Sequence, residues 1–347
     1  MKEIKFGIIG TGTIADFHAK AIAAVEGATL VGVYSRSKEK AAAFAACHNT
    51  VAADSLEALL ATPGLDAVCV TTPSGSHAEV AVPALKAGKH VLCEKPLDVT
   101  LGKVDAIIDA AAESGSRLAA VFQMRFGEGA LKVKEAVEAG RFGRLTMCSA
   151  YIKWYRSQEY YDQGAWRGTK AFDGGGVLFN QGIHGIDLLQ WLVGMPSEVQ
   201  ASVATLAHER IEVEDTAVAL LKYPNGALGV IEGSTATWPG FSTRIEISGD
   251  KGTAIIEDGR ITTWAFVEEQ EGDAGIKESA AAPKLGSGAS DPKAISIEGH
   301  RLQVEDLAQA IREGRAPVIQ GEDARNAVQL ILAIYEAAEK GAPVKLG

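Results

Sequence analysis

Short apolar runs alternate with helix-like segments through the first third of the chain. The runs have the length of buried strands, and the segments between them carry Ala, Leu and Lys at helical spacing. The expected strands are Phe6–Ile9, Leu30–Tyr34, Ala67–Val70, Val91–Cys93 and Leu118–Phe122, and the expected helices are Ala15–Val25, Lys38–Ala46, Ala78–Ala87 and Leu101–Ser114. Because parallel strands need such crossovers, residues 1–123 are predicted to form a Rossmann-type α/β domain with a doubly wound parallel sheet.

After Arg125 the pattern changes to longer β-rich stretches. One helix-like segment, Ala130–Ala139, precedes them, and helices near Gln303–Glu313 and Asp323–Lys340 close the chain. The expected strands are Leu145–Tyr155, Val199–Leu206, Thr216–Tyr223, Ala227–Ser234 and Thr243–Ser248. This pattern predicts a second, α+β domain over residues 124–347 with a large, mostly antiparallel open sheet. Gly, Ala, Ser and Pro are frequent in Glu271–Pro292, which is expected to be a mobile surface loop.

The composition narrows the functional classes. With 34 Lys and Arg against 44 Asp and Glu, the formal net charge is −10, which argues against a nucleic acid partner. The cysteines show no CxxC spacing, so we expect reduced, structural thiols. Because the chain shows neither a signal-peptide pattern nor an apolar run that could span a bilayer, we expect a cytoplasmic protein with no membrane partner.

The strongest local motif follows the first expected strand. Gly10-Thr11-Gly12-Thr13-Ile14-Ala15 has the G-x-G-x-x-A form and leads into a helix. The glycines permit close approach of the backbone to a pyrophosphate, and the helix N-terminus supplies hydrogen-bond donors. Alone, the motif is also compatible with an ordinary strand-to-helix turn, but the β-α alternation that follows favours a dinucleotide site. We expect the cofactor to contact Gly10, Gly12, Thr13 and Ile14.

The end of the second strand bears on the choice between NAD and NADP. A carboxylate there would bind the adenosine ribose and repel a 2'-phosphate. This chain has Ser35 and Arg36 at that position, and both can hold a 2'-phosphate through charge-assisted hydrogen bonds. We therefore favour NADP over NAD, although an arginine can equally lie across the adenine face of NAD or remain solvated.

The third strand ends in a hydroxyl-rich turn, from Thr71 to His77. Ligands of open α/β sheets bind at the edge formed by the carboxyl ends of the strands. We therefore expect Thr72, Pro73 and His77 to line the cofactor site. Ser76 or His77 can equally be a helix cap, because serine and its relatives favour caps for local reasons.

The fourth strand ends in Glu94-Lys95-Pro96, and a lysine at this edge can stabilise an alkoxide. With the glycine turn before it and a β-rich domain after it, this tripeptide resembles the glucose-fructose oxidoreductase/inositol dehydrogenase (Gfo/Idh/MocA) family. The resemblance extends to the closing stretch Gly321–Ala327. It implies that Lys95 reaches both the nicotinamide and the reacting hydroxyl and that the proline is commonly cis. We also expect Glu94 and Gln123 at the cofactor.

A second signature places polar residues after a glycine triplet, Gly174–Gly176. Asn180, His184 and Asp187 fall at i, i+4 and i+7. A helix starting near Leu178 would therefore place them on one face, which we expect to meet the cofactor. The resemblance implies that His184 is the general acid/base. Many sugar and inositol dehydrogenases of the family have Asp where this chain has Asn180, which can orient a hydroxyl but cannot carry a proton.

These motifs imply an NAD(P)-dependent oxidoreductase. It would transfer a hydride between the nicotinamide and a ring hydroxyl or ketone carbon of a sugar, with Lys95 and His184 as catalytic residues. The expected substrate-binding residues are Asn180, Arg125, Tyr155, Trp166 and Arg167.

Two alternatives remain open. The Asn180–His184 segment, with Trp166–Thr169 upstream, resembles the branch that contains nucleotide-sugar 3-dehydrogenases. A bound diphosphate would then require basic residues, for which Arg156, Lys170 and Arg244 are candidates. The other alternative is a non-catalytic dinucleotide or sugar sensor of the same fold, although the presence of both Lys95 and His184 argues against it.

No metal site is expected. His184 and Asp187 have no second histidine at helix spacing, and Glu212, Glu214 and Asp215 are typical of a solvated turn or strand end. By analogy with the family, one face of the β-rich sheet is expected to form a homodimer or homotetramer.

Overall fold

The computed structural model describes residues 2–164, 166–280 and 296–346. Its chain divides into two compact units: Met1–Gln123 with Ser296–Arg325, and Met124–Ile295 with Asn326–Gly347. The boundary after Gln123 coincides with the expected one, whereas Ser296–Arg325 groups with the first unit and not, as expected, with the second. The physical reason is hydrophobic packing, since Val304, Leu307 and Ala308 are fully buried in the core cluster of the first unit.

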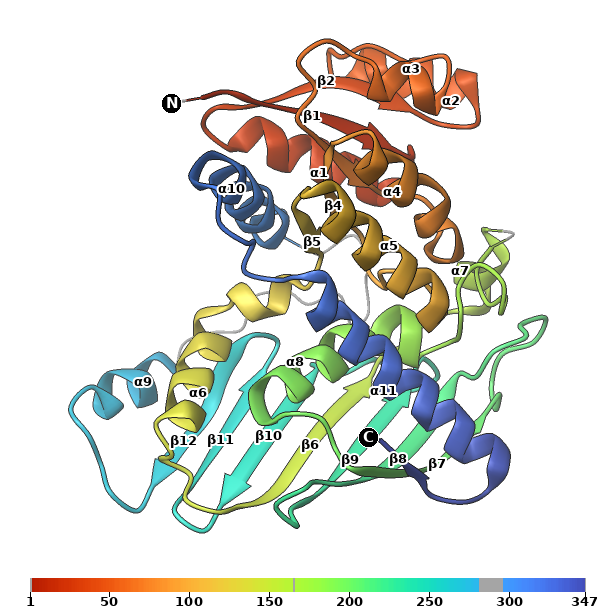
Figure 1. Cartoon of the computed structure of the whole chain (residues 1–347). Helices are drawn as coiled ribbons and strands as arrows, with labels where there is room; N and C mark the ends of the chain where they lie inside the picture. Colours follow the sequence, from red (N-terminus) through yellow and green to blue (C-terminus); the bar gives the residue numbers. More distant parts are fainter. Residues whose placement is uncertain (1, 165, 281–295, 347) are drawn as a thin grey trace. The chain divides into compact units, whose positions relative to one another are not determined.

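The first unit contains a five-stranded parallel sheet in the order β2-β1-β3-β4-β5. Its strands are β1 Ile4–Ile9, β2 Ala28–Tyr34, β3 Ala67–Val70, β4 His90–Cys93 and β5 Leu118–Ala120. Its helices include α1 Thr13–Ala24, α2 Lys38–Cys47, α3 Leu56–Leu60, α4 His77–Lys86, α5 Leu101–Ser114 and α10 Glu298–Glu313. The α/β prediction is confirmed, and only the short helix α3 was not expected in this region (Figure 1).

The carboxyl ends of β1, β3 and β4 are neighbours at one edge of this sheet. The last three residues of each of these strands are apolar and buried, and Ile8, Cys69 and Leu92 show no exposure. Such strand ends have no room for polar side chains, so the residues that follow each strand are the first at this edge that can carry chemistry. The glycine turn, the Thr71–His77 turn and Glu94-Lys95-Pro96 therefore start from the same edge.

The second unit contains an eight-stranded sheet in the order β12-β11-β10-β6-β9-β8-β7-β13. Its strands are β6 Leu145–Lys153, β7 Glu198–Ala204, β8 Thr216–Lys222, β9 Leu228–Ser234, β10 Arg244–Gly249, β11 Gly252–Glu257, β12 Arg260–Phe266 and β13 Val344–Lys345. The pairing is antiparallel throughout except between β6 and β9, which confirms the mostly antiparallel prediction. Strands β11, β12 and β13 were not predicted.

Helices cover one face of the second sheet. The helices of this unit are α6 Glu128–Glu138, α7 Gln158–Asp162, α8 Ile183–Val193 and α9 Asp273–Ala280 among the described residues, while α11 Gly321–Lys340 begins in the first unit and continues in the second. Helix α8 packs on β6 and β10, and α6 packs on β11 and β12 (Figure 1). These helices cover the side of the sheet that carries the His184 segment.

Part of the expected loop Glu271–Pro292 is helical. Helix α9 occupies Asp273–Ala280, and residues 281–292 lie outside the described residues. Asp273 is buried and accepts hydrogen bonds from both terminal nitrogens of Arg141, at 2.9 and 2.7 Å, and from Trp264 Nε1 at 2.7 Å. The loop prediction was therefore wrong for 273–280, because a contact with residues distant in sequence anchors the start of the helix.

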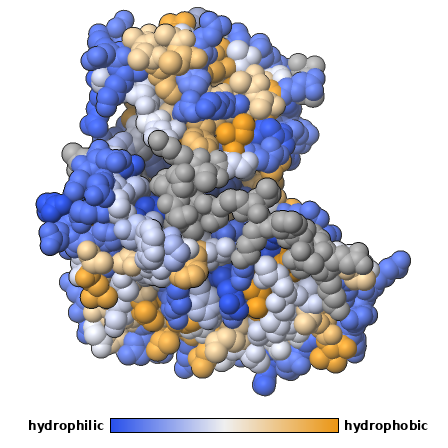
Figure 2. Space-filling model, turned by 180° about the vertical axis from the view of Figure 1, so that it is seen from behind, coloured by the Kyte–Doolittle hydropathy of each residue, from blue (hydrophilic) through white to orange (hydrophobic). Residues whose placement is uncertain are grey.

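The uncovered face of the second sheet carries apolar side chains. Along β8, buried and exposed residues alternate, and both Val218 and Leu220 are on the exposed side. Met147 and Leu228, which are paired between β6 and β9, are also exposed. In the view from behind, hydrophobic residues lie among hydrophilic ones on the surface (Figure 2). Within the described residues, no helix combines the length and the hydropathy that crossing a membrane requires.

Candidate active site

The glycine turn after β1 has the features that a dinucleotide pyrophosphate requires. Gly10 has φ +110°, and a Cβ there would lie 2.7 Å from the backbone oxygen of Thr71. A Cβ on Gly12 would meet nothing within 4 Å, so this position borders open space. Helix α1 begins at Thr13 without a side-chain cap, which leaves its N-terminal donors to a ligand. These residues fit the cofactor that the sequence predicts.

The end of β2 offers hydroxyl groups and one cation. The Thr11 hydroxyl donates to Ser35 Oγ at 3.2 Å, which ties this strand end to the glycine turn. Arg36 is exposed. Within the described part of the chain its side chain makes no ion pair, and the next residue, Ser37, caps α2 by accepting from Lys40 N. Arg36 is therefore available to a ligand on this surface.

His77 ends the hydroxyl-rich turn that follows β3. Its ring is buried between two strand-end turns, with Nδ1 2.8 Å from the Pro96 oxygen and Nε2 2.8 Å from the Thr72 oxygen. Ser76 precedes α4 but makes no side-chain cap. The His77 side chain therefore connects the Thr72 and Pro96 turns, and its place at the cofactor site stays a prediction. Thr72 and Pro73 are partly exposed, as a contact with the cofactor requires.

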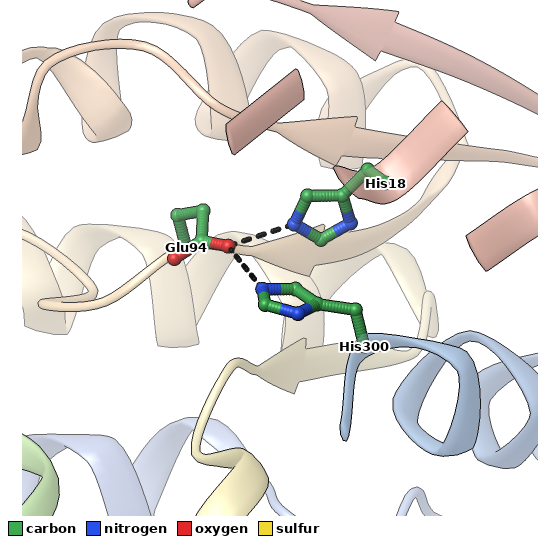
Figure 3. Close-up of side chains that lie close together, drawn as sticks. All are labelled: His18, Glu94 and His300. Carbon is green, nitrogen blue, oxygen red and sulfur yellow. Dashed lines mark hydrogen bonds and ion pairs between the residues drawn. The ribbon is translucent and has the colours of Figure 1, made fainter. Parts of the chain in front are cut away.

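Glu94 and Lys95 differ in burial although they are adjacent. Lys95 is partly exposed, and the Lys95–Pro96 peptide is cis, as the resemblance implies. Glu94 is 6% exposed and its carboxylate lies against the imidazoles of His18 and His300 (Figure 3). The carboxylate of Glu94 is thus engaged inside the first unit, and the contact of Glu94 with the cofactor stays a prediction.

The sequence gives no signal for the grouping of His18, Glu94 and His300. Their ligand-type atoms lie within 4.8 Å of one another, as in many metal sites. However, His18 Nε2 is 2.8 Å from Glu94 Oε1, which is a hydrogen-bond distance. Metal-bound histidines usually donate a hydrogen bond through the second ring nitrogen, whereas neither Nδ1 atom has a partner among the described residues. We therefore describe the three as a hydrogen-bonded cluster.

Gln123, three residues after β5, carries a polar group that a ligand can use. Its Oε1 is buried, and no donor among the described residues reaches it. Gly299 of α10 packs against its side chain, since a Cβ there would lie 2.6 Å from Gln123 Cβ. A buried acceptor without a donor is costly. A bound cofactor amide or hydroxyl would remove that cost, which fits the predicted role of Gln123.

The His184 segment begins with a π-helical turn, Leu178–Gly182, that runs into α8. Gly182 N donates to Val177 O at 2.6 Å, and a Cβ on Gly182 would lie 2.8 Å from that oxygen. The helix therefore starts where the sequence predicted, but the wider turn was not foreseen. Turns of this kind are frequent at functional sites. Asn180 and His184 are both partly exposed, and Asn180 Nδ2 donates to Asp173 at 2.8 Å.

Asp187 and Arg125 form a buried ion pair. Arg125 Nε and Nη2 donate to the two Asp187 oxygens at 2.8 and 2.6 Å, and the guanidinium lies 5.4 Å from the Trp191 ring centre. Their side chains are 2% and 1% exposed. The pair fixes α8 inside the second unit. That Arg125 orients the substrate and that Asp187 shares a cofactor-facing surface stay predictions.

Glu214 holds the start of the His184 segment. It is buried and accepts hydrogen bonds from Gly176 N at 2.9 Å, Leu178 N at 3.0 Å and the Tyr335 hydroxyl at 2.9 Å. Burial raises the pKa of Glu214, and these donors oppose the rise. A Cβ on Gly176 would lie 1.6 Å from the Glu214 backbone oxygen, which explains a glycine there. The prediction of a solvated turn was wrong for Glu214 and for the fully buried Asp215.

The segment before the glycine triplet gathers aromatic and cationic side chains. The Arg167 guanidinium lies 4.3 Å from the Tyr160 ring centre and 5.5 Å from that of Trp166. Gln181 Nε2 donates to the Tyr160 hydroxyl at 3.3 Å, so this group adjoins the turn that carries Asn180. Tyr155 instead pairs edge-on with Trp238 at 4.9 Å.

The comparisons with known proteins agree with both units. A family model described as an oxidoreductase family with an NAD-binding Rossmann fold matches residues 4–122, and a model of the GFO/IDH/MocA C-terminal domain matches residues 130–255. The chain belongs to the GFO/IDH/MocA oxidoreductase family. One relative, the 1,5-anhydro-D-fructose reductase of Ensifer adhaerens, is 30% identical over 72% of this chain and 75% of its own.

Other relatives align with all or nearly all of this chain. The myo-inositol 2-dehydrogenase of Thermotoga maritima is 28% identical over 99% of this chain and 98% of its own. The crystal structure of the WlbA dehydrogenase from Bordetella pertussis, in complex with NADH and UDP-GlcNAcA, is 34% identical with a TM-score of 0.87 and covers 100% of this chain and 99% of that one.

Removal of the Asp187 carboxylate is expected to destabilise the second unit strongly. In Asp187→Leu the Arg125 guanidinium stays buried without its partner, which costs about 3–5 kcal/mol. The double variant Arg125→Met with Asp187→Leu should regain most of the lost stability, because no buried charge remains. Urea unfolding followed by tryptophan fluorescence measures both. Asp162→Leu, which breaks the exposed pair with Arg210, is the control and should unfold near the wild-type midpoint. A small loss in Asp187→Leu would contradict the structural role of the pair.

Proposed function

We propose that this oxidoreductase transfers a hydride between a nicotinamide and a ring hydroxyl or ketone carbon of a sugar or sugar derivative. The observation that carries the proposal lies in the first unit: Lys95 emerges partly exposed from the same sheet edge as the open glycine turn. Ligands of this fold bind at that edge. The names of the relatives, among them inositol and levoglucosan dehydrogenases, support a polyhydroxylated substrate.

In the proposed reaction the bound nicotinamide supplies the hydride acceptor or donor. His184 takes the proton of the reacting hydroxyl, and Lys95 stabilises the alkoxide that develops. Asn180, with its amide held by Asp173, orients a substrate hydroxyl. Trp166, Arg167 and Tyr155 are the further proposed substrate contacts. The cofactor is held by the glycine turn, the second strand end, Thr72, Pro73, Lys95 and Gln123.

A nucleotide sugar is the second candidate substrate. The solved WlbA structure, which holds UDP-GlcNAcA, is similar over the whole chain, and this supports the alternative. Arg167 is partly exposed and lies 4.3 Å from the Tyr160 ring centre, where it can meet an anionic group. Arg156 lies 5.5 Å from the same ring centre but is buried, which makes it less suitable. Arg244 is less suitable, because it pairs with Glu246. Lys170 is exposed and stays a candidate.

Replacement of the proposed proton-handling residues is expected to stop turnover. Lys95→Ala and His184→Ala should each lower kcat by about 10²–10⁴-fold. His184→Ala should leave the dissociation constant for the dinucleotide unchanged, because the glycine turn is untouched. Absorbance of the reduced nicotinamide, with a panel of inositols, free sugars and UDP-sugars, measures the rates. Lys86→Ala, at the end of α4, is the matched control. Absence of wild-type turnover over the panel, with dinucleotide binding intact, would favour the sensor alternative.

The choice of dinucleotide stays the prediction that Arg36 supports. The exposed guanidinium and the missing carboxylate favour NADP, whereas the related structures that contain NADH favour NAD. Titration with NADPH and with NADH, followed by nicotinamide fluorescence, is expected to show tighter NADPH binding that Arg36→Asp reverses, since aspartate repels the 2'-phosphate. Arg117→Asp, which is remote in sequence from this strand end, is the control. Tighter NADH binding by the wild type would refute the NADP preference.

We further propose that the uncovered face of the second sheet pairs with a second copy of the chain. The exposed apolar residues on β6, β8 and β9 support this, since patches of this kind mark interaction surfaces, and a symmetric dimer places the same patch on both subunits. A tetramer would need a further contact. The cytoplasmic location expected from the sequence also stays a prediction.

A charge on this face should dissociate the oligomer. Val218→Lys with Leu220→Lys places two cations on adjacent exposed positions of β8, where Leu220 is 58% exposed. Light scattering after size exclusion is expected to show a dimer or tetramer for the wild type and a monomer for the variant. Val267→Lys, 77% exposed and beyond β12, is the control and should keep the wild-type mass. A monomeric wild type at micromolar concentration would refute the proposal.

A further inference from the structure

Three segments far apart in the sequence meet at one buried carboxylate. His18 comes from α1, Glu94 from the end of β4 and His300 from α10, all within the first unit (Figure 3). His18 Nε2 lies 2.8 Å and His300 Nε2 3.5 Å from the same oxygen, Glu94 Oε1. The three side chains are almost inaccessible, with residue exposures of 0%, 6% and 2%.

The geometry fixes how the hydrogen atoms are arranged. An anionic carboxylate accepts hydrogen bonds only, so each imidazole presents an N–H at Nε2. The Nδ1 atoms of both rings are buried without a partner among the described residues, which suits a bare nitrogen better than a second N–H. Burial lowers the pKa of His18 despite the carboxylate. Burial also disfavours the charge of Glu94, but hydrogen bonds from His18 and His300 hold the pKa of Glu94 well below its usual range.

Among the described residues, His18 and His300 are the side chains that shift the pKa of Glu94. The thiols of Cys69 on β3 and Cys93 on β4 have pKa values raised by burial, with a further contribution from the Glu94 charge. Both thiols are therefore neutral near neutral pH. On the side of α1 and α10 the titratable neighbours are His18 and His300 themselves, and on its own turn the carboxylate is followed by Lys95.

Glu94 also binds the backbone of the residue proposed to be catalytic. Its second oxygen, Oε2, accepts from Lys95 N at 3.2 Å. The same turn is held from another side by His77, whose Nδ1 contacts the Pro96 oxygen. Helix α10 makes a similar contact with the residues after β5, where Gln303 Oε1 accepts a hydrogen bond from Phe122 N at 2.7 Å. The strand ends that border the proposed nicotinamide site are thus tied to α10 by side-chain bonds.

We propose that His18 and His300 are positioning residues for Lys95, acting through Glu94. The two imidazole donors keep the carboxylate charged and in place, and the carboxylate fixes the turn from which the lysine side chain extends. This inference rests on the proposed function, because the position of Lys95 affects catalysis only if Lys95 acts on a substrate. Helix α10 thereby acts on the proposed active site indirectly, through His300 and Glu94.

The first test compares His300→Leu with His300→Gln. Leucine removes the donor, so Glu94 takes up a proton at higher pH and the Lys95 turn loosens. The expected result is a kcat lower by about tenfold to a hundredfold, with KM within about threefold, because small misplacements of catalytic groups cost this much. The acid limb of the pH–kcat profile should move to higher pH, since activity is lost as Glu94 becomes protonated. Glutamine, whose Nε2 can donate to the carboxylate, should restore most of both.

His48→Leu is the matched control, because His48 also belongs to the first unit and pairs with a carboxylate, Asp16, away from Glu94. It should keep the wild-type pH profile. Circular dichroism and the thermal midpoint verify that each variant is folded. A folded His300→Leu with wild-type kcat and an unchanged acid limb would overturn the inference and leave the proposed function standing.

The second test needs no turnover. Nitrogen-15 spectra of histidine-labelled apoprotein should show the Nε2–H form for His18 and His300, and the His18 signal should stay neutral at pH values where exposed histidines are protonated. Metal analysis of the purified protein is expected to find no stoichiometric zinc. A His18 that titrates like a free imidazole, or one zinc per chain lost in His300→Leu, would overturn the hydrogen-bonded cluster. If the wild type bound no dinucleotide, the proposed function would fail. The spectra would still test whether His18 and His300 donate hydrogen bonds to Glu94.

Discussion

A parallel sheet brings the carboxyl ends of its strands to one edge, and the proposed chemistry of the first unit depends on this constraint. The carboxyl-terminal halves of β1, β3 and β4 are buried and offer only apolar side chains. Polar function therefore starts with the residues that follow each strand. Backbone hydrogen bonds still reach the first residue of each turn, as from Thr71 N to Ile9 O and from Glu94 N to Val70 O, and side chains add further bonds. Thr71 Oγ1 donates to Ile9 O, His77 contacts the next turn, and Glu94 accepts from Lys95 N.

The second unit meets the same need with buried carboxylates. Glu214 receives the first backbone donors of the His184 segment, and Asp187 locks α8 to Arg125. Each carboxylate has several donors, as burial of a charge requires. In Asp215 the donors include three backbone N–H groups, from Leu206, Ala207 and His208. Glu214 and Asp187 anchor the two ends of the segment in which Asn180 and His184 are partly exposed.

The sequence predicted what depends on local pattern. Strand and helix periodicity gave the alternation of the first unit, and the position of a residue just after a strand singled out Gly10, Lys95 and the hydroxyl turn. It did not predict pairings between distant segments. Nothing near Glu94 indicates that α10 will return to the first unit and place His300 beside it. Likewise Glu214 reads as a turn residue until the close approach of Gly176 shows that its carboxylate is enclosed.

The buried residues of the two motifs share one physical feature. Motif residues were expected at the ligand because the motif is functional, yet a motif contains both the groups that act and the groups that hold them. Burial separates the two kinds. Lys95, Asn180 and His184 are partly exposed, whereas the neighbours that share their motifs, Glu94 and Asp187, are enclosed and bonded within their own unit. Spacing along the chain cannot make this distinction, because one residue step reverses the direction of a side chain at a strand end. The number of hydrogen-bond donors around a carboxylate in the folded structure does distinguish an enclosed residue from an exposed one.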